Sequence, residues 1–510
     1  MSILDLKGAP VLVIGAGIMG AGIAQVAAQA GHPVMMFDMR EGAAAEAKAK
    51  LAASLQALVD KGKLTADSVA QALSRIQAIA TLDAAAQAAL VVEAIVEKLD
   101  AKRGLFKQLE GIVSPDCVLA TNTSSISVTA IANGLQHPGR LVGMHFFNPV
   151  PLMKLVEVVS GLQTSQAVAD AIFDISKTWG KVPVHARSTP GFIVNRIARP
   201  YYAETLALLQ EQASTPAVLD ACLRAVGFRM GPCELMDLIG HDTNFSVTSS
   251  VFEANFFDKR FVPSLVQREL VDGGLLGRKS GRGFYDYSPG AASVALAAFV
   301  PATEAAALPP HARLSVAGAG LLADRLANKL QAAGAAFERD QTSAWTGLTV
   351  DGAELRLTDG RPASSLGSQQ GANVAVFDLP VSQQEGATLA WAPSCRPSEA
   401  WAAQAPQWLR VLGFNPVQVA DTPGLVVART LAMLINEAAD AVHQGVCSQQ
   451  GADSAMKLGV NYPAGPFEWL AGWSVAAVTG VLDAMDAHYR GERYRVSPWL
   501  RQQAWKEAQA

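Results

Sequence analysis

A histidine and a glutamate that could act together, His145 and Glu157, lie in two apolar runs of the sequence. The run "GRLVGMHFF" predicts a strand that ends near the histidine, and "MKLVEVV" predicts a second strand that carries the glutamate. Between them the prolines of 148–151 force a turn, because proline fixes φ and restricts the residue before it. Such a turn can bring the two side chains together. The carboxylate would then fix the imidazole tautomer and favour the imidazolium formed when the ring takes a proton.

The elements beside such a pair decide what it does, and the N-terminal sequence predicts a dinucleotide site. The run "APVLVIGAGIMGAGIAQVAAQAGHPVMMFD" indicates a strand, a glycine turn, a helix and a second strand. The turn fits GxGxxG, in which the glycines allow a tight turn, approach of a pyrophosphate and close helix packing. The predicted cofactor contacts in this turn are Gly15, Gly17, Ile18, Met19 and Gly20.

Asp38 ends the second of these strands. A carboxylate there accepts hydrogen bonds from the ribose hydroxyls and repels a 2′-phosphate, so NAD is favoured over NADP. Arg40, two residues on, weakens that preference. The alternative for the whole segment is a βαβ turn that binds no nucleotide.

Next to a nicotinamide, the histidine and glutamate have a definite chemistry. His145 would remove the proton from a hydroxyl group while hydride leaves the carbinol carbon. General base catalysis of this kind contributes roughly 10²–10⁴-fold. The alternative is a core histidine satisfied by a structural glutamate. The nucleotide pattern in the same chain favours the catalytic interpretation.

The composition excludes several other classes of protein. The chain has 510 residues, of which 50% are hydrophobic and 17% charged, as expected of a folded protein with several domains. A net charge of −4 gives no basic field for nucleic acid. The five cysteines are scattered and form no CxxC pair, so free thiols in a reducing cytoplasmic compartment are expected, with no metal site.

One uncharged stretch, residues 8–37, is long enough to suggest a membrane span. Its glycines and the break at Gly31-His32-Pro33 favour a strand, a turn and a buried helix instead. No basic segment or cleavage site precedes it, so we expect neither a membrane anchor nor a secretory signal.

Residues 41–75 predict a helical hairpin that breaks near Lys61-Gly62-Lys63. Its lysines are either a solvated face or a local anion site. Further along, "AALVVEAIVEKLDAKRGLFKQL" predicts a strand and a helix with Glu93 near the turn, and "CVLATNTSSIS" predicts a strand that ends in a polar turn over 121–125. Polar side chains at the carboxyl ends of strands bind ligands in open α/β sheets.

The second half of the chain repeats parts of the first. "TPGFIVNRIARPYYAET" at Thr189 returns as "TPGLVVARTLAMLINEA" at Thr422, and a Gly-Pro turn follows each copy. Both copies predict helices. Asn195, which could reach the active site from the first helical turns, is replaced by Ala428, so the repeat keeps packing residues and loses the amide. The alternative for Asn195 is a surface amide or a helix-start residue.

Between the repeats, "ARLSVAGAGLLADRLANKLQAAGAAFERD" follows the N-terminal pattern less closely. Gly318 and Gly320 are in place, Ala323 replaces the third glycine, and Asp340 takes the place of Asp38. No paired histidine and glutamate follow. A shortened Rossmann-like domain without catalytic groups, and without NAD, is the simplest prediction, and an unrelated small α/β domain is the alternative.

The runs "NTSS", "HFFNPVPLMKLVEVV" and "TPGFIVNR" resemble those of the 3-hydroxyacyl-CoA dehydrogenase family, and the similarity extends from about residue 8 to Leu276–Tyr287. The resemblance implies oxidation of (S)-3-hydroxyacyl-CoA to 3-ketoacyl-CoA with NAD, His145 as the base and Glu157 as its partner. It implies that Ser124 and Asn195 hold the substrate oxygens. The implied NAD contacts are Glu93, Lys98, Asn122, Ser124, Asn148 and Lys279. The implied coenzyme A contacts are Ser54, Lys61 and Ser124.

Long family members with this layout imply 3-hydroxybutyryl-CoA or 3-hydroxyadipyl-CoA as substrate, in fatty-acid or phenylacetate and other aromatic catabolism. Short members dimerise through the helical domain, so the repeat predicts an intramolecular pseudo-dimer, with a homo-oligomer also open. The alternatives are a non-catalytic subunit of a multienzyme complex and a β-hydroxyacid dehydrogenase that acts on free acids.

The predicted fold class is an α/β Rossmann NAD-binding domain and an all-α domain, followed by a reduced Rossmann-like domain and a second copy of the all-α domain. The predicted segments are the Rossmann domain 1–188, the first helical copy 189–288, a linker 289–312, the reduced domain 313–419 and the second helical copy 420–510.

Overall fold

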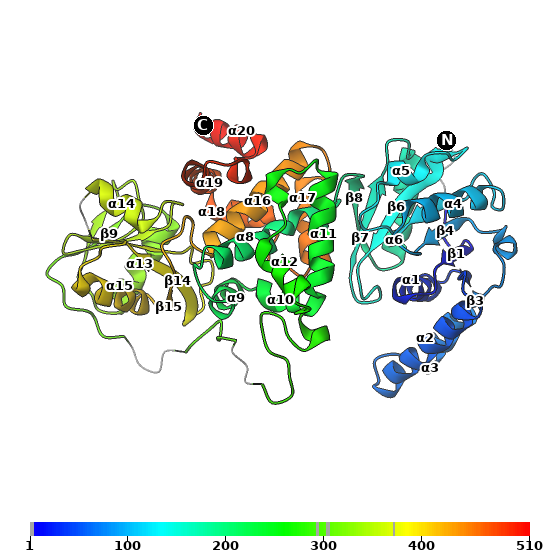
Figure 1. Cartoon of the computed structure of the whole chain (residues 1–510), viewed down its shortest axis with the longest axis horizontal. Coiled ribbons are helices and arrows are strands. Elements are labelled where there is room, and N and C mark those ends of the chain that lie inside the picture. Colours follow the sequence, from blue (N-terminus) through cyan, green and yellow to red (C-terminus); the bar gives the residue numbers. More distant parts are fainter. Residues whose placement is uncertain (1–4, 292–294, 302–305, 371–372, 510) are drawn as a thin grey trace. The chain divides into compact units, whose positions relative to one another are not determined.

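The computed structural model describes residues 5–291, 295–301, 306–370 and 373–509 (Figure 1). It consists of two compact units. The first comprises Met1–Arg196 and Gln444–Val460, and the second comprises Ile197–His443 and Asn461–Ala510. Of the predicted linker, residues 292–294 and 302–305 lie outside the described residues.

The first unit is built on an eight-stranded sheet with the order β3-β2-β1-β4-β5-β6-β7-β8. Neighbouring strands are parallel except β6 and β7, which are antiparallel. The strands are β1 Val11–Ile14, β2 Val34–Phe37, β3 Ile76–Ala78, β4 Leu90–Glu93, β5 Val118–Thr121, β6 Leu141–Phe146, β7 Leu155–Ser160 and β8 Val182–Arg187. Short β-branched runs such as "VLVI" form fully buried strands here, as expected for a mostly parallel sheet.

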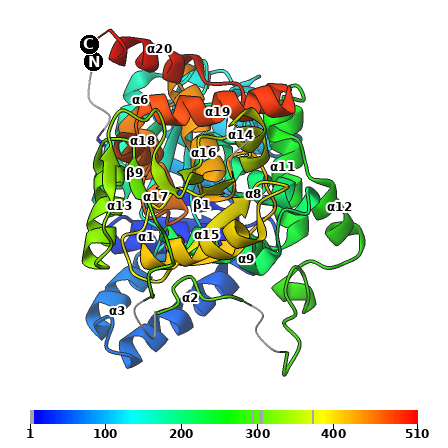
Figure 2. The ribbon, with the colours of Figure 1, turned by 90° about the vertical axis from the view of Figure 1, so that its left-hand side faces the viewer.

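Helices follow the strands in the βαβ manner. They are α1 Ile18–Gln29, α2 Ala43–Asp60, α3 Ala66–Ser74, α4 Leu99–Glu110, α5 Val128–Ala132 and α6 Gln166–Thr178. Residues of α1, α2, α3 and α6 share one hydrophobic core with one face of the sheet. The predicted hairpin is present as α2 and α3, which lie side by side (Figure 2).

One helix of the second half of the sequence belongs to this unit. Helix α17, Gln449–Gly459, packs against β7 and β8, and the Arg187 N–H of β8 donates to the Val446 carbonyl just before it at 2.9 Å. One face of the eight-stranded sheet is therefore covered, at β7 and β8, by a segment of the repeat.

The second unit contains most of both helical copies. Helices of the first copy are α8 Arg199–Gln210, α9 Pro216–Ala225, α10 Pro232–Ile239, α11 His241–Ala254 and α12 Leu265–Asp272. Helices of the second copy are α16 Val427–His443, α18 Pro466–Trp473, α19 Val475–Tyr489 and α20 Pro498–Glu507. The long helices α8 and α16 pack against each other (Figure 1).

Contacts between the two copies are reciprocal. Arg493 binds Glu204 at 2.7 Å, and Arg260 binds Glu437 at 3.3 Å. Counted from the two Thr-Pro-Gly turns, the two glutamates are equivalent, and so are the two arginines. Such an exchange of the same contact is the pattern of a two-fold symmetric interface.

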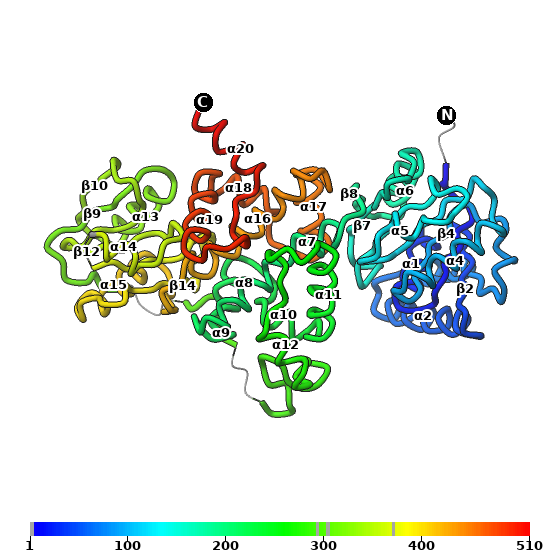
Figure 3. The backbone as a smooth tube through the Cα atoms, turned by 45° about the horizontal axis from the view of Figure 1, so that its top comes forward, coloured from blue at the N-terminus to red at the C-terminus, as the bar shows by residue number. Residues whose placement is uncertain are grey.

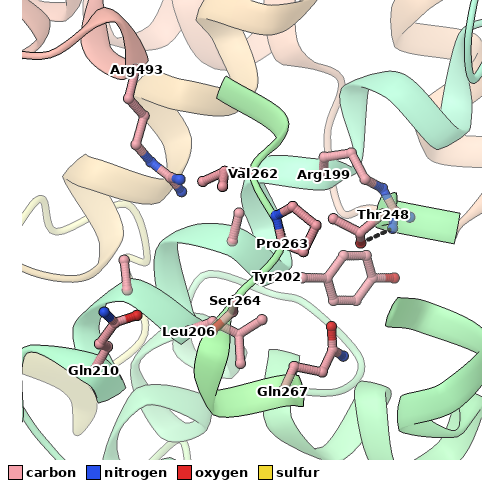
Figure 4. Close-up of a pocket in the computed structure, with 12 residues that line it drawn as sticks. Arg199, Tyr202, Leu206, Gln210, Thr248, Val262, Pro263, Ser264, Gln267 and Arg493 are labelled. Carbon is pink, nitrogen blue, oxygen red and sulfur yellow. Dashed lines mark hydrogen bonds between the residues drawn. The ribbon is translucent and has the colours of Figure 1, made fainter. Parts of the chain in front are cut away.

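These glutamate–arginine contacts are buried. Burial raises the pKa of Glu204, yet Arg493 and Arg429 hold it below its ordinary value, so the carboxylate stays charged. A cavity beside this contact is lined by Arg199, Thr248 and Arg493, and the Arg199 guanidinium donates to the Thr248 hydroxyl at 3.1 Å (Figure 4). The cavity therefore lies where the two copies meet.

The second unit also holds a seven-stranded mixed sheet, with the order β10-β9-β11-β12-β13-β14-β15. Its strands are β9 Leu314–Ala317, β10 Glu338–Asp340, β11 Gly347–Val350, β12 Ala353–Leu357, β13 Val374–Phe377, β14 Ala387–Pro393 and β15 Phe414–Gln418, and its helices are α13 Leu321–Ala332, α14 Ala363–Gln370 and α15 Glu399–Val411. In Figure 3 the chain runs through β9, α13 and β10, which form one βαβ unit with parallel strands. The hairpin of β11 and β12 was not predicted from the sequence.

The predicted fold class is confirmed by this architecture, with a Rossmann sheet, a helical region, a second reduced sheet and a repeated helical region. The boundaries of the five predicted segments remain predictions. Within the described ranges, no helix is long and apolar enough to cross a membrane.

Candidate active site

The predicted histidine and glutamate face each other across neighbouring strands. β6 and β7 are antiparallel, with His145 directly opposite Glu157. The imidazole Nδ1 lies 2.6 Å from the Glu157 carboxylate, and the two residues are 6% and 0% exposed. Because the carboxylate accepts the Nδ1 proton, the second ring nitrogen, Nε2, is left free of it and can accept one.

The same glutamate is fixed from a second side. Its other oxygen, Oε1, accepts the backbone N–H groups of Ile193 and Val194 at 3.0 and 2.9 Å. These residues follow the Thr-Pro-Gly turn, so the start of the first helical copy holds the carboxylate that orients the histidine. Both oxygens of this buried carboxylate therefore have hydrogen-bond partners, as a buried polar group requires.

Two phenylalanine rings pack beside the imidazole. The ring of His145 lies 4.6 Å from that of Phe147 and 5.8 Å from that of Phe192, centroid to centroid. The site around the pair is thus apolar on these sides, and polar interactions are stronger where water is excluded.

The residues expected to hold substrate oxygens are brought together. Ser124 lies in the polar turn after β5, and the Asn195 amide lies 3.5 Å from the Ser124 carbonyl oxygen. Both side chains are only half-buried.

The glycine turn fits a dinucleotide. A Cβ on Gly20 would lie 1.7 Å from the Gly15 carbonyl oxygen, and one on Gly15 would lie 2.4 Å from that of Ala94, so neither position admits a side chain. Above Gly17 nothing lies within 4 Å, which leaves the backbone open to a pyrophosphate at the start of α1.

Asp38, expected to bind the ribose, follows β2 and lies beside the glycine turn. Its carboxylate accepts the N–H groups of Ala16 at 2.7 Å and Arg40 at 2.9 Å, which ties the glycine turn to the end of β2. Arg40 itself donates both terminal nitrogens to Glu46, at 3.1 and 2.8 Å. The arginine is therefore paired with a carboxylate in an exposed ion pair.

Glu93 and Lys98, two of the expected NAD contacts, differ in exposure, because Glu93 is buried and Lys98 is exposed. Glu93 is 0% exposed and its carboxylate accepts from Lys102 and the Thr121 hydroxyl, each at 2.6 Å. It is enclosed within the protein. Lys98 is exposed at the start of α4.

A neighbouring glutamate that the sequence did not single out faces the polar turn. Glu97 accepts from the Thr123 hydroxyl at 2.6 Å and from the Ser124 N–H at 2.9 Å, and Lys102 lies 3.2 Å away. Burial raises the pKa of Glu97, but Lys102 and the hydrogen bonds from Thr123 and Ser124 hold it below its ordinary value. Glu97 is thus a charged, partly exposed acid beside Ser124.

The remaining predicted residues are spread more widely. Asn122 accepts the Phe146 N–H at 2.8 Å and so links the ends of β5 and β6. Asn148 is exposed in the turn after β6, and Ser54 and Lys61 are exposed on α2 and just after it. Lys279 lies in the second unit, where it is paired with Asp242. Among the residues described, no cluster of His, Cys, Asp or Glu could hold a metal ion.

A Rossmann sheet with an open glycine turn, a carboxylate just after β2 and a buried histidine–glutamate pair is the arrangement of an NAD-dependent dehydrogenase. Residues 10–189 match the NAD binding domain of 3-hydroxyacyl-CoA dehydrogenase, and 191–287 and 424–507 each match its C-terminal domain. Residues 355–423 match the 3-hydroxybutyryl-CoA dehydrogenase reduced Rossmann-fold domain. The chain belongs to the 3-hydroxyacyl-CoA dehydrogenase family.

Individual relatives agree with this assignment. The chain is 42% identical to the 3-hydroxyadipyl-CoA dehydrogenase of Escherichia coli (strain K12) over 500 residues, which is 98% of each chain. The crystal structure of 3-hydroxybutyryl-CoA dehydrogenase from Escherichia coli K12 substr. MG1655 superposes with a TM-score of 0.87 at 41% identity, covering 99% of both chains. The mitochondrial hydroxyacyl-coenzyme A dehydrogenase of Homo sapiens is 41% identical over 286 residues, which cover 54% of this chain and 90% of that protein.

Proposed function

We propose that His145 is the general base with which this NAD-dependent dehydrogenase oxidises an (S)-3-hydroxyacyl-CoA to the 3-ketoacyl-CoA. The contact between Nδ1 and Glu157, at 2.6 Å in a buried site, is the observation that carries the proposal. Nε2 takes the proton of the 3-hydroxyl group, and the carboxylate stabilises the resulting imidazolium. When bound, NAD accepts the hydride that leaves the carbinol carbon.

The groups around this pair have separate tasks. Ser124 and Asn195 donate hydrogen bonds to the substrate oxygen, and their proximity at 3.5 Å supports a common target. The turn over 15–20 and Asp38 hold the dinucleotide. For the nicotinamide side, the exposure of Glu97 and its bonds to the 123–124 turn support this acid over the enclosed Glu93.

The proposal also includes other predicted polar residues. Asn122 and Asn148 contribute to the NAD site, and Ser54 with Lys61 to the coenzyme A site, while the NAD contacts expected of Lys98 and Lys279 stay predictions. The exposure of Ser54 and Lys61 on the α2–α3 hairpin is compatible with binding of the anionic coenzyme.

The second half of the chain replaces a partner subunit. The reciprocal contacts Glu204–Arg493 and Glu437–Arg260 support an intramolecular pseudo-dimer, with one catalytic pair and one silent copy. We expect the enzyme to be cytoplasmic and to need no nucleic acid or membrane partner.

The substrate is 3-hydroxybutyryl-CoA or 3-hydroxyadipyl-CoA, by analogy with relatives that carry those names over nearly the whole chain. Values of kcat/KM across a series of 3-hydroxyacyl-CoAs, with and without a terminal carboxylate, test this choice. A preference for the dicarboxylic thioester assigns the enzyme to aromatic or phenylacetate catabolism, and a preference for the C4 substrate assigns it to fatty-acid metabolism. Turnover of free 3-hydroxy acids but not of the thioesters would contradict both.

A further inference from the structure

Helix α17 of the second copy covers the face of the sheet that carries the catalytic pair. Val156 and Val158 of β7 belong to the core on the α1 and α6 side. Successive side chains of a strand alternate, so Leu155 and Glu157 point to the opposite face. There α17 approaches closely: a Cβ on its Gly459 would lie 2.6 Å from Leu155 Cδ2.

Gly459 lies against three residues, two of which contact the catalytic pair. After Leu155, the nearest atoms to its position are Val194 Cγ2 at 3.0 Å and Phe147 Cε1 at 3.6 Å. The Val194 N–H donates to Glu157, and the Phe147 ring lies against His145. Leu155 lies two residues before Glu157 on the same face. An added Cβ at Gly459 would therefore require Leu155 Cδ2 and Val194 Cγ2 to shift, and Val194 is one of the residues that hold Glu157, whereas 3.6 Å from Phe147 is an ordinary van der Waals contact.

The first helical copy has a different residue at this place. Counted back from the two Gly-Pro turns, Gly459 corresponds to Ala225, which is buried in the core of the reduced sheet, and α9 packs on β14 there. The copy that docks on the non-catalytic sheet has a Cβ at this position, and the copy that docks on the catalytic sheet lacks one. Gly459 is the last residue of α17 and does not have a positive φ, so the backbone does not require glycine there, whereas the 2.6 Å approach of Leu155 gives its use a steric reason.

We propose that Gly459 is a positioning residue, which lets α17 of the second copy hold Leu155, Val194 and Phe147 so that the His145–Glu157 pair keeps its reactive geometry. The silent copy thus completes the catalytic unit. This inference rests on the proposed role of the pair.

The test is Gly459→Ala, which installs the residue of the first copy. We expect the purified protein to be folded, with kcat for 3-hydroxybutyryl-CoA at least about tenfold lower, because small misplacements of catalytic groups cost up to roughly 10²-fold. The KM for NAD should stay within about twofold. The pH profile of kcat should also shift, because the imidazole and carboxylate no longer meet as before. A merely structural role would lower the melting temperature and leave this profile unchanged.

Two further variants make the steric cause explicit. Leu155→Val removes the atom nearest to the new Cβ, so the double variant with Gly459→Ala should recover most of the lost kcat relative to Leu155→Val alone. Gly480→Ala in α19, where no atom lies within 4 Å of the added Cβ, is the matched control and should leave kcat unchanged.

Wild-type kcat and pH profile in folded Gly459→Ala would overturn the inference, as would a loss that Leu155→Val does not relieve. If Gly459→Ala does not fold, Phe147→Leu tests the same relay, and unchanged turnover there would equally overturn it. His145→Gln separates the two levels of the argument. If that variant is inactive while Gly459→Ala behaves as the wild type, only the positioning role fails, whereas an active His145→Gln removes the proposed function itself.

Discussion

Glu157 and Asp378 each accept backbone N–H groups at the start of a helical copy, but only Glu157 also faces a histidine. Glu157 accepts the N–H groups of Ile193 and Val194 after the first Thr-Pro-Gly turn. Asp378 accepts those of Val426, Val427 and Ala428 after the second, at 2.7–2.9 Å. The reduced domain has kept the carboxylate that anchors its helical copy and has lost the imidazole.

This relationship predicts that removing the charge of Glu157 lowers turnover, whereas removing the charge of Asp378 lowers stability only. Glu157→Gln presents an N–H to Nδ1, so the other tautomer is favoured and Nε2 can no longer accept a proton. We expect kcat to fall at least about 10²-fold, the lower end for general base catalysis. Asp378→Asn should lower the free energy of unfolding by about 1–3 kcal/mol, since buried N–H groups lose an acceptor, and leave kcat unchanged.

Steady-state kinetics and urea unfolding of the two variants decide this comparison. Equal losses of turnover in both would show that the reduced domain is not silent.

The contacts between helical copies predict a stability effect without a kinetic one. Arg260 is 6% exposed and binds both Glu437 and Asp440. Arg260→Met leaves these carboxylates without that cation, which should cost about 3–5 kcal/mol in urea unfolding, the range for breaking a buried ion pair. The control is Lys177→Met, whose pair with Asp174 is exposed and should contribute less than about 1 kcal/mol. If Arg260→Met left the free energy of unfolding unchanged, the contacts between the two copies would not be needed for stability, which would contradict the pseudo-dimer.

Lys181 predicts a pH dependence of stability. It is buried between α6 and β8, and it donates to the carbonyls of Val150 and Met153 in the turn between the catalytic strands. Burial, with a further effect from Lys154, lowers its pKa from 10.5 to about 8. Between these values the unfolded chain binds more protons than the folded one, so the free energy of unfolding rises with pH.

Lys181→Met should remove this rise. The difference in unfolding free energy between wild type and variant, measured from pH 7.5 to 10, isolates the lysine because other groups titrate alike in both proteins. Parallel curves over that range would show that Lys181 titrates as an exposed lysine does.

The two glycine turns predict one NAD per chain. In the reduced domain the place of the third glycine is taken by Ala323, which is fully buried. Calorimetric titration should give a stoichiometry near one, and Gly17→Val, which fills the open space above the turn, should weaken binding at least about tenfold. Two sites of similar affinity, or binding that survives Gly17→Val, would assign a cofactor to the second sheet.

The catalytic pair was predictable because its determinants are local. Two apolar runs and a turn of two prolines bring His145 and Glu157 into register, and the alternation of side chains places both on one face. The glycine turn and Asp38 lie within one βαβ unit, whose pattern is equally local.

Other features could not be read in this way. Glu93 and Glu97 both lie near the end of β4. The sequence pattern does not predict that Lys102 and Thr121 enclose Glu93 and leave it without access to a ligand. The position of Glu97 just beyond the strand was an available signal, because ligands bind outside the carboxyl ends of strands. Likewise Asp351-Gly352, with φ of 50° and 86°, forms the turn of the β11–β12 hairpin, for which an Asp-Gly pair is a typical sequence signal.

The docking of α17 on the catalytic sheet is a tertiary fact. Its periodicity is that of any amphipathic helix, and the similarity of the two copies predicts two alike helical domains. Only packing reveals that residues 444–460 belong to the first unit. The role of Gly459 could therefore not be predicted from the sequence, because it depends on contacts with residues far away in the chain.

The central claim is that the buried imidazole of His145 accepts the substrate proton. The most direct measurement is kcat of His145→Gln with (S)-3-hydroxybutyryl-CoA and saturating NAD, alongside the Kd of NAD and the melting temperature. We predict kcat at least about 10²-fold below wild type, with NAD affinity and melting temperature nearly unchanged. Turnover within about tenfold of wild type in that folded variant would contradict the account.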